Sequence, residues 1–267
     1  MESAKHPLRP RQFLDNLAAT GRYHFDSAEA HAALGGSAAA TNVALSRLAK
    51  QGAIASPSRG FYVIVPPEYR KLGCLPADQF IPDLMNALKV PYYVGLLTAA
   101  QYHGAAHQRP QEFQVLVDKA RRAVACDNVR VAFVVRKRLR KVPVQSVNTL
   151  RGTMRVSTPE ATALDLVGYQ DRAGGLGNVA TVLAELAERL DADKLAVVVA
   201  TAPLPWAQRL GYLLERVEAG DKTERMKSYV RARAHDTALL LPGAPRKKAT
   251  RDETWKLLIN ANVETDL

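Results

Sequence analysis

Hydrophobic positions near the N-terminus repeat with the spacing of two short helices. Residues 8–20 place apolar side chains three and four positions apart, and this pattern stops at Gly21. A second helix is expected from Asp26, whose carboxylate can cap free backbone N–H groups, to Leu34, and Gly35-Gly36 would supply the following turn. The positions expected to face inward are Phe13, Leu14 and Leu17 in the first helix and Ala30, Ala33 and Leu34 in the second.

A third helix is expected after the N-cap Ser37, and it has one apolar and one polar face. The face that would pack on the first two helices carries Ala44, Leu45 and Leu48. The opposite face matches the chemistry of DNA, because Asn and Arg can form paired hydrogen bonds with base edges, Val43 can contact a thymine methyl group and Lys50 suits a phosphate. The predicted DNA-binding residues here are Ser37, Asn42, Val43, Ser46, Arg47 and Lys50.

The next residues alternate like a two-stranded hairpin, which would complete a winged helix-turn-helix DNA-binding domain over residues 1–67. A strand is expected from Ile54, a turn at residues 56–58, and a return strand that points Phe61, Val63 and Val65 inward. Arg59 lies at the expected wing tip, where a basic side chain can contact a minor groove or a phosphate, so it is also predicted to bind DNA. Winged helices also mediate protein contacts, and this alternative stays open because a fold does not fix a function.

A larger mixed domain is predicted from residue 76 to residue 267, with a sheet-containing part (76–157) and a helical part (158–267). In its longest strand Val129, Val131, Phe133 and Val135 would share one side. Strands that precede helices indicate an α+β fold rather than a doubly wound sheet. Helices are expected at 77–88 and 92–103, strands at 113–117, 129–136, 142–147 and 153–157, and further helices at 159–169, 178–189, 192–200, 205–219 and 223–234.

The charge of the chain favours a polyanionic partner, nucleic acid first, because 37 basic residues stand against 26 acidic ones. The excess is small in residues 1–75, which hold nine basic and five acidic residues. Residues 119–155 hold eleven basic residues and one acid, Asp127, and therefore predict a basic surface with a role in DNA binding or in another task of the second domain. Its predicted members are Arg121, Arg122, Arg130, Arg136, Lys137, Arg138, Arg140 and Lys141.

Cysteine usage and hydropathy predict a cytoplasmic protein with no membrane partner. Cys74 and Cys126 lack metal-ligand spacing and are typical of buried thiols in a reducing compartment. The N-terminus has no apolar segment typical of a signal peptide, and the longest apolar run, 195–202, is too short to cross a bilayer. Neither a metal nor a cofactor is expected.

The candidate catalytic motifs do not form a convincing active site. HGAAH at 103–107 has the histidine spacing of zinc proteases, but Gly104 stands where the general-base Glu would be. GGLG at 174–177 follows no predicted strand and lacks GK[ST], so a loop before a helix is the better interpretation. Glu160 is interpreted as a first-turn acid and Asp165 as the partner of a nearby basic side chain. The sequence therefore predicts no catalytic residue and no enzymatic activity.

Several segments together resemble the AbiEi antitoxin family, the antitoxin half of the abortive-infection AbiE toxin–antitoxin system. The resemblance covers nearly the whole chain in the right order. It rests on SRLAKQGAIxxxxRGFY at 46–62, YYVGLLTAAQYHGAAHQRPQEFQV at 92–115, VSTPEATALDLVGY at 156–169, AGGL at 173–176, ELAERLD at 185–191 and QRLGYLLE at 208–215.

The resemblance implies a winged helix that binds inverted repeats upstream of its own operon and represses that operon. It also implies a second domain that counters a nucleotidyltransferase-like toxin. The system would be of type IV, in which the antitoxin and the toxin are not assumed to form a stable complex. It supports Arg47 and Arg59 as DNA contacts, Tyr62 as a packing residue of the hairpin, and mainly structural roles for 92–104 and 157–166. Inverted repeats require two copies on the DNA, and a monomer is expected in solution. The alternative is a nucleic-acid-processing enzyme delivered by a winged helix, with Asp118 and Lys119 as its candidate residues, although no companion acid is evident.

Overall fold

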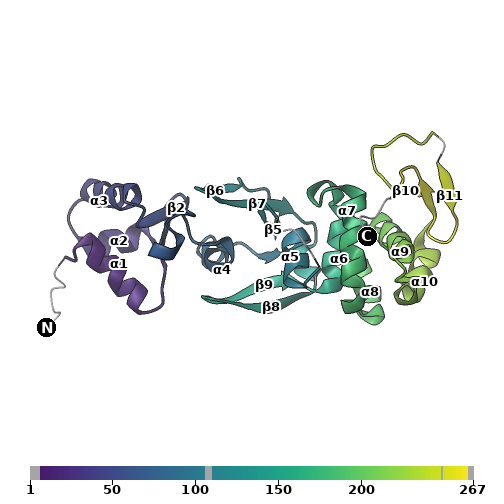
Figure 1. Cartoon of the computed structure of the whole chain (residues 1–267), viewed down its shortest axis with the longest axis horizontal. Helices are drawn as coiled ribbons and strands as arrows, with labels where there is room; N and C mark the ends of the chain where they lie inside the picture. The colour runs from purple at the N-terminus through teal and green to yellow at the C-terminus, as the bar shows by residue number, and fades with distance from the viewer. Residues whose placement is uncertain (1–6, 106–109, 248, 264–267) are drawn as a thin grey trace. The chain divides into compact units, whose positions relative to one another are not determined.

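The computed structural model describes residues 7–105, 110–247 and 249–263 and divides by contacts into two units (Figure 1). The first unit consists of Met1–Val90, Arg121–Phe133 and Val147–Met154. The second unit consists of Pro91–Ala120, Val134–Ser146 and Arg155–Leu267. The chain therefore passes between the units several times, and the predicted domain boundary between residues 67 and 76 stays a prediction.

The first unit begins with the predicted winged helix. Its three strands form an antiparallel sheet in the order β1-β3-β2, beside the three helices. This topology confirms the predicted α+β winged helix and adds β1, a strand too short for its alternation to be recognised in the sequence. The elements are α1 Pro10–Ala19, β1 His24–Asp26, α2 Ser27–Leu34, α3 Ala38–Lys50, β2 Ile54–Ser58 and β3 Phe61–Ile64.

Both predicted N-caps are present. The Asp26 carboxylate accepts a hydrogen bond of 2.8 Å from the backbone N–H of Glu29, and the Ser37 hydroxyl accepts one of 3.2 Å from the backbone N–H of Ala40. Each bond satisfies a backbone donor that the first turn of a helix leaves unpaired, so the caps fix where α2 and α3 begin.

Aromatic packing holds this small core together. Phe25 is fully buried, with the Phe13 ring edge-on to it at 5.1 Å and the Tyr62 ring stacked on it at 5.3 Å. The packing role predicted for Tyr62 is thereby confirmed. The remaining buried residues of the cluster are Leu14, Ala30, Leu45, Leu48, Ile54 and Ile64.

The predicted turn at residues 56–58 is wrong, because β2 continues to Ser58 and the hairpin turns at Arg59 and Gly60. Ser58 lies opposite Phe61, and Gly60 has a φ of +77°, a conformation that glycine adopts without steric cost. The ladder is irregular between Ala55 and Ser58. Pro57 lies in that stretch and has no N–H to donate, which explains why Ser-Pro-Ser resembles a turn in the sequence.

The rest of the first unit surrounds residues 67–90, which form η1 Pro67–Tyr69 and α4 Ala77–Ala87. The turn after β6 (Val124–Cys126) lies against residues 71–74, since the Asn128 backbone N–H donates to the Leu72 carbonyl at 3.2 Å. Cys74 and Cys126 are free and buried, as predicted. Their thiols are hydrogen-bonded to each other, and this bond together with burial raises the pKa of Cys74.

The second unit contains the central part of a mixed sheet whose strand order is β6-β7-β5-β4-β9-β8. β4 runs antiparallel to β5 and parallel to β9, where Val94 pairs with Val156. The predicted strands are confirmed within a few residues, while β6 was not expected. The remaining elements here are β4 Tyr92–Val94, α5 Leu96–Tyr102, β5 Phe113–Val117, β7 Val129–Val135, η2 Leu139–Lys141, β8 Val144–Thr149 and β9 Gly152–Ser157.

The helix predicted for residues 92–103 is wrong in its first third. Residues 92–94 form the buried strand β4, and α5 begins only at Leu96. Tyr, Tyr and Val are strong strand formers, and Gly95 separates the two elements. A Cβ atom at Gly95 would lie 2.0 Å from a Leu116 methyl carbon, so the close approach of β5 requires glycine at this position.

Helices form most of the remaining second unit, and α6, α7, α8, α9 and α10 pack together around one hydrophobic core (Figure 1). Residues after α10 form a small sheet in the order β10-β12-β11, so the helical pattern does not continue to the end as predicted. The elements are α6 Pro159–Gly168, η3 Gln170–Arg172, α7 Gly175–Leu186, η4 Ala187–Arg189, α8 Ala192–Val198, η5 Val199–Thr201, α9 Leu204–Arg216, η6 Gly220–Lys222, α10 Glu224–Arg233, β10 Ala238–Leu239, β11 Thr250–Asp252 and β12 Leu257–Ile259. Among the described residues, none of these helices has the length and apolar character needed to cross a membrane.

Candidate nucleic-acid interface

The side chains of α3 and its N-cap that the sequence assigns to DNA are all exposed. Val43, the large apolar one among them, has 51% of its surface exposed. The inward face buries Leu45 and Leu48 as predicted, and it also buries Thr41, whose hydroxyl lies 3.2 Å from Nδ1 of His31. The helix therefore has one face committed to the core and one free face. The exposed predicted residues are Ser37, Asn42, Val43, Ser46, Arg47 and Lys50.

The wing tip is held to the helical part of the first unit. Arg59 is exposed, and the carbonyl of the next residue, Gly60, accepts a hydrogen bond of 3.1 Å from the backbone N–H of Ser27 at the start of α2. Because this bond ties the turn to α2, the guanidinium of Arg59 is carried by a fixed backbone rather than by a loose loop. α3 and the wing tip belong to the same unit.

A residue that the sequence analysis did not single out for the interface supports this unit from a distant part of the chain. The Arg151 guanidinium lies 3.3 Å from the centre of the Tyr23 ring and donates through Nε to Oε1 of Gln79 at 2.7 Å. Gln79 donates in turn to the hydroxyl of Tyr69 at 2.9 Å. Arg151 counted only as one more positive charge in the sequence, since nothing in its neighbours indicates an aromatic partner 128 positions earlier.

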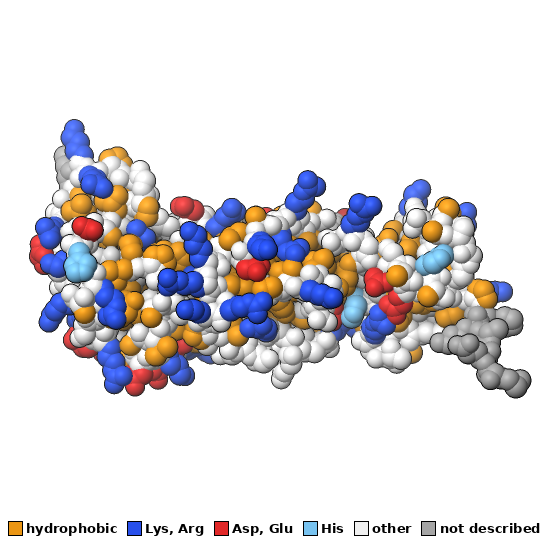
Figure 2. All heavy atoms as spheres, turned by 180° about the vertical axis from the view of Figure 1, so that it is seen from behind, with side chains coloured by type: hydrophobic (Ala, Val, Ile, Leu, Met, Phe, Trp, Pro, Cys, Tyr) orange, Lys and Arg blue, Asp and Glu red, His pale blue; other side chains and the backbone are white. Residues whose placement is uncertain are grey.

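The basic cluster at residues 119–155 is divided between the two units. Arg121, Arg122 and Arg130 belong to the first unit and are exposed. The exposed members in the second unit are Lys119, Lys137, Arg138, Arg140, Lys141 and Arg155. Figure 2 shows Lys and Arg side chains gathered over the middle of the face drawn there, with few acidic side chains among them. The cluster thus consists of two sets of cations that belong to different units.

Arg136 does not belong to the basic surface, and its predicted exposure is wrong. Its side chain is only 2% exposed, while Val135, predicted on the opposite side of the strand, is 41% exposed. The buried face of β7 changes along the strand: Val129 and Val131 are buried on one side, whereas Ala132, Val134 and then Arg136 are buried on the other. Arg136 therefore faces the core of the second unit, whereas the sequence pattern of the strand predicted that it lies on the outside.

The buried guanidinium of Arg136 is paired with the carboxylate of Asp165 on α6. Nε of Arg136 lies 2.8 Å from Oδ1, and the Tyr93 hydroxyl donates to Oδ2 at 2.6 Å. Nη1 donates to the carbonyls of Lys137 and Thr201, at 2.8 and 3.3 Å. This network confirms that Asp165 pairs with a basic side chain. Burial raises the pKa of the Tyr93 hydroxyl, and the adjacent carboxylate adds to this effect, so the phenol remains protonated and donates to Asp165.

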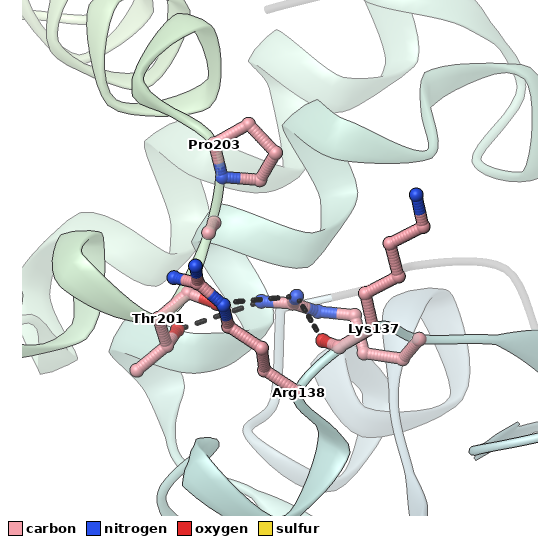
Figure 3. Close-up of a pocket in the computed structure, with 6 residues that line it drawn as sticks. Lys137, Arg138, Thr201 and Pro203 are labelled. Carbon is pink, nitrogen blue, oxygen red and sulfur yellow. Dashed lines mark hydrogen bonds between the residues drawn. The ribbon is translucent and has the colours of Figure 1, made fainter.

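A pocket of about 340 Å³ lies above this ion pair, lined by residues 136–138 on one side and 201–203 on the other (Figure 3). Arg136, one of the lining residues, donates to the carbonyls of Lys137 and Thr201. In Figure 3 the side chains of Lys137 and Arg138 extend from the loop after β7. Two exposed cations thus border a hollow whose base is already fixed by hydrogen bonds.

The other candidate catalytic residues lie apart from this pocket. His103 is buried and donates from Nε2 to the Ser157 carbonyl at 2.8 Å, whereas His107 lies outside the described residues. Glu160 is buried in the first turn of α6 and accepts from the backbone N–H of Asp191 at 3.2 Å. Asp118 is exposed directly after β5. Within the described ranges, no three metal-ligating side chains come together.

Burial of His103 makes the stability of the second unit depend on pH. Burial lowers the pKa of the imidazole below its ordinary 6.5, with Arg189 adding to this effect and the Ser157 carbonyl and Glu160 opposing it. An unfolded chain therefore binds a proton as the pH falls through about 6.5, before the folded chain does. The contribution is complete above that pH and is lost below it, by up to about 1.4 kcal/mol per pH unit. Urea unfolding between about pH 5 and pH 8 should show this slope, and His103→Gln should reduce it.

Comparisons with known proteins agree with the architecture. Residues 93–216 match the family model of the AbiEi antitoxin C-terminal domain. The solved structure of the RV2827C protein from Mycobacterium tuberculosis superposes with a TM-score of 0.65 over 98% of this chain and 93% of that one, at 14% sequence identity, and thus shares the fold. No curated protein matches the chain. The matched range contains the Arg136–Asp165 pair and the lining of the pocket. Residues 93–216 thus match the C-terminal domain of the AbiEi antitoxin family, the family that the sequence resembles.

Proposed function

We propose that this antitoxin-family protein represses its own operon by binding inverted repeats through α3 and the wing. The observation that carries the proposal is the free face of α3, which exposes an amide, two hydroxyls, two cations and one large apolar side chain within a winged helix. These groups are suited to base edges, a thymine methyl group and phosphates. Two protomers would occupy the two halves of the repeat, each a monomer before it binds.

Replacing Arg47 by alanine is expected to weaken binding to the operator. A bidentate contact from arginine to guanine contributes about 1–3 kcal/mol, so the dissociation constant should rise roughly 5- to 150-fold, and discrimination against a mutated repeat should decrease. Arg59→Ala should weaken operator and unrelated DNA more evenly, because a wing-tip contact to phosphate carries no sequence information. Fluorescence anisotropy with both duplexes at one fixed salt concentration measures the two effects.

Lys89→Ala is the matched control for these variants. Lys89 is exposed in the first unit, shortly after α4 and outside α3 and the wing. The substitution removes one positive charge, as the two arginine substitutions do. If Arg47→Ala and Arg59→Ala bind the operator as tightly as Lys89→Ala does, then α3 and the wing are not the DNA-binding surface.

The second unit is proposed to counter a nucleotidyltransferase-like toxin without forming a stable complex with it. The division of the basic cluster supports separate tasks, since Arg121, Arg122 and Arg130 share a unit with the winged helix and the other exposed members do not. We expect Arg121→Glu/Arg122→Glu to weaken operator binding and to flatten its salt dependence, because contacts that release fewer counterions respond less to salt. Neutralisation of the toxin should persist in this variant, measured as growth of cells that express both proteins. Loss of neutralisation with intact repression would reverse the assignment.

The protein is proposed to act as a regulator rather than as an enzyme. A processing enzyme would need Asp118 as an acidic residue at its active site, and incubation of nucleic acid with divalent metal tests for it directly. We expect no cleavage by the intact chain. Metal-dependent cleavage that disappears in Asp118→Ala would contradict the proposed function.

A further inference from the structure

The pocket between residues 136–138 and 201–203 is a built site with a single sign of charge. Three consecutive basic residues form one wall, and none of the six lining residues is acidic. Arg136, the buried residue of the lining, is paired through Nε with the Asp165 carboxylate, which also accepts from the buried Tyr93 hydroxyl. Asp165 therefore neutralises Arg136, while Lys137 and Arg138 keep their positive charges at the surface of the pocket.

The loop that carries these two cations is fixed by the backbone. The backbone N–H of Arg136 donates to the Val117 carbonyl at 2.8 Å, and that of Lys141 donates to the Arg138 carbonyl at 2.8 Å. Leu139 directly follows the two cations in sequence, and its buried side chain anchors the loop. Arg138 adopts a left-handed conformation with a φ of 57°, which residues other than glycine rarely adopt. The fold thus fixes the backbone that carries the two cations.

The opposite wall adds a favourable field for an anion. Pro203 is the N-cap of α9, a helix of 13 residues, so the positive end of its dipole lies at the pocket. Thr201 is tied into the base of the pocket because its carbonyl and hydroxyl accept from Arg136 and its hydroxyl donates to the Val198 carbonyl at 2.7 Å. Ala202 and Pro203 supply a small apolar surface beside these charges.

We propose that this pocket binds a phosphate group. Lys137 and Arg138 give a phosphate two charge-assisted donors, the dipole of α9 adds a favourable field, and the six lining residues include no carboxylate to repel the phosphate. A volume of about 340 Å³ admits a phosphate chain or a single nucleotide phosphate with part of its sugar. The phosphate can belong to a free nucleotide or to the backbone of a nucleic acid, and this site does not depend on DNA binding by the winged helix.

The experiment compares two matched pairs of substitutions in the full chain. Lys137→Ala/Arg138→Ala removes two cations that line the pocket, and Arg140→Ala/Lys141→Ala removes two exposed cations a few residues further along. Arg136 is left intact because it belongs to the core. Isothermal titration calorimetry with sodium tripolyphosphate and with a nucleoside triphosphate measures the free-ligand source. We expect at least about a tenfold loss of affinity in the first pair and less than about a twofold change in the second, since charge-assisted contacts within a pocket are specific to position.

The second arm tests the backbone of duplex DNA as the source. If it supplies the phosphate, the slope of log affinity against log salt should fall by about 2 in the pocket pair and not in the control pair. Either a pocket-specific loss of polyphosphate binding or a pocket-specific change in slope supports the site. Equal effects in the two pairs, or no polyphosphate binding together with an unchanged slope, would overturn it. Arg47→Ala should leave polyphosphate binding unchanged, which separates this result from the fate of the proposed operator contact.

Discussion

Asp165→Ala is expected to lower the free energy of unfolding by about 3–5 kcal/mol, because removing one partner of a buried ion pair leaves the other charge without compensation. Arg136 is 2% exposed and would lose its Nε partner, while the Tyr93 hydroxyl would lose its acceptor. Urea unfolding, followed by far-UV circular dichroism, gives the free energy directly. The loss is large because two polar groups share one carboxylate that water does not reach.

Two further variants determine whether the effect belongs to the ion pair. Asp171→Ala removes an exposed carboxylate in η3 and should change stability by less than about 0.5 kcal/mol. Arg136→Met/Asp165→Leu removes both charges and keeps similar volumes, and such replacements are often neutral or stabilising. The double variant should therefore be more stable than Asp165→Ala. If it is equally unstable, the cost comes from lost packing on α6 and not from the unpaired charge.

Trp255→Ala is expected to cost about 3–5 kcal/mol, the range for deleting a large aromatic side chain from a core. Trp255 is fully buried, although it lies in the small C-terminal sheet region rather than among the helices. A Cβ atom added to Gly211 would lie 2.1 Å from the indole ring, so α9 and the ring approach closely at this glycine. The indole Nε1 donates to the Glu215 carboxylate at 2.8 Å. The residues after α10 are thereby an integral part of the second unit.

Trp255→Phe separates packing from hydrogen bonding. Phenylalanine keeps much of the apolar surface but lacks the N–H group that Glu215 accepts, so the expected cost is about 0.5–1.5 kcal/mol. Thermal unfolding of the three proteins under one set of conditions should rank wild type above Trp255→Phe and Trp255→Phe above Trp255→Ala. Equal melting temperatures for wild type and Trp255→Ala would show that the C-terminal sheet contributes nothing to the stability of the second unit.

Local signals explain which elements could be predicted from the sequence. Asp26 and Ser37 cap their own helices, and Leu45 and Leu48 lie one turn apart, so the winged helix is determined by residues close together in the chain. The exposed face of α3 follows from the same periodicity. The strand at 92–94 did not follow from it, because a short, fully buried strand shows no alternation and its apolar run resembles a buried helix.

The roles of the arginines depended on partners that are distant in sequence. Arg136 lies among exposed cations in the chain, yet its acid is 29 positions away on α6. Arg151 likewise acquires its role from Tyr23 and Gln79. A count of charges treats all eleven basic residues as equal, whereas burial assigns one of them, Arg136, to the interior. The pocket at residues 136–138 was also beyond the reach of the sequence, since its second wall comes from residues 201–203.

The interleaving of the chain between the units has a consequence for how such proteins can diversify. Recombination at one point between residues 67 and 76 would transfer the winged helix without Arg151 and without the turn at Asn128, both of which belong to the first unit. Exchange of the winged helix as a single gene segment is therefore expected to yield misassembled hybrids. Under the proposed function, new operator preferences should arise by point substitution on the exposed face of α3, where side chains can change without disturbing the packing of either unit.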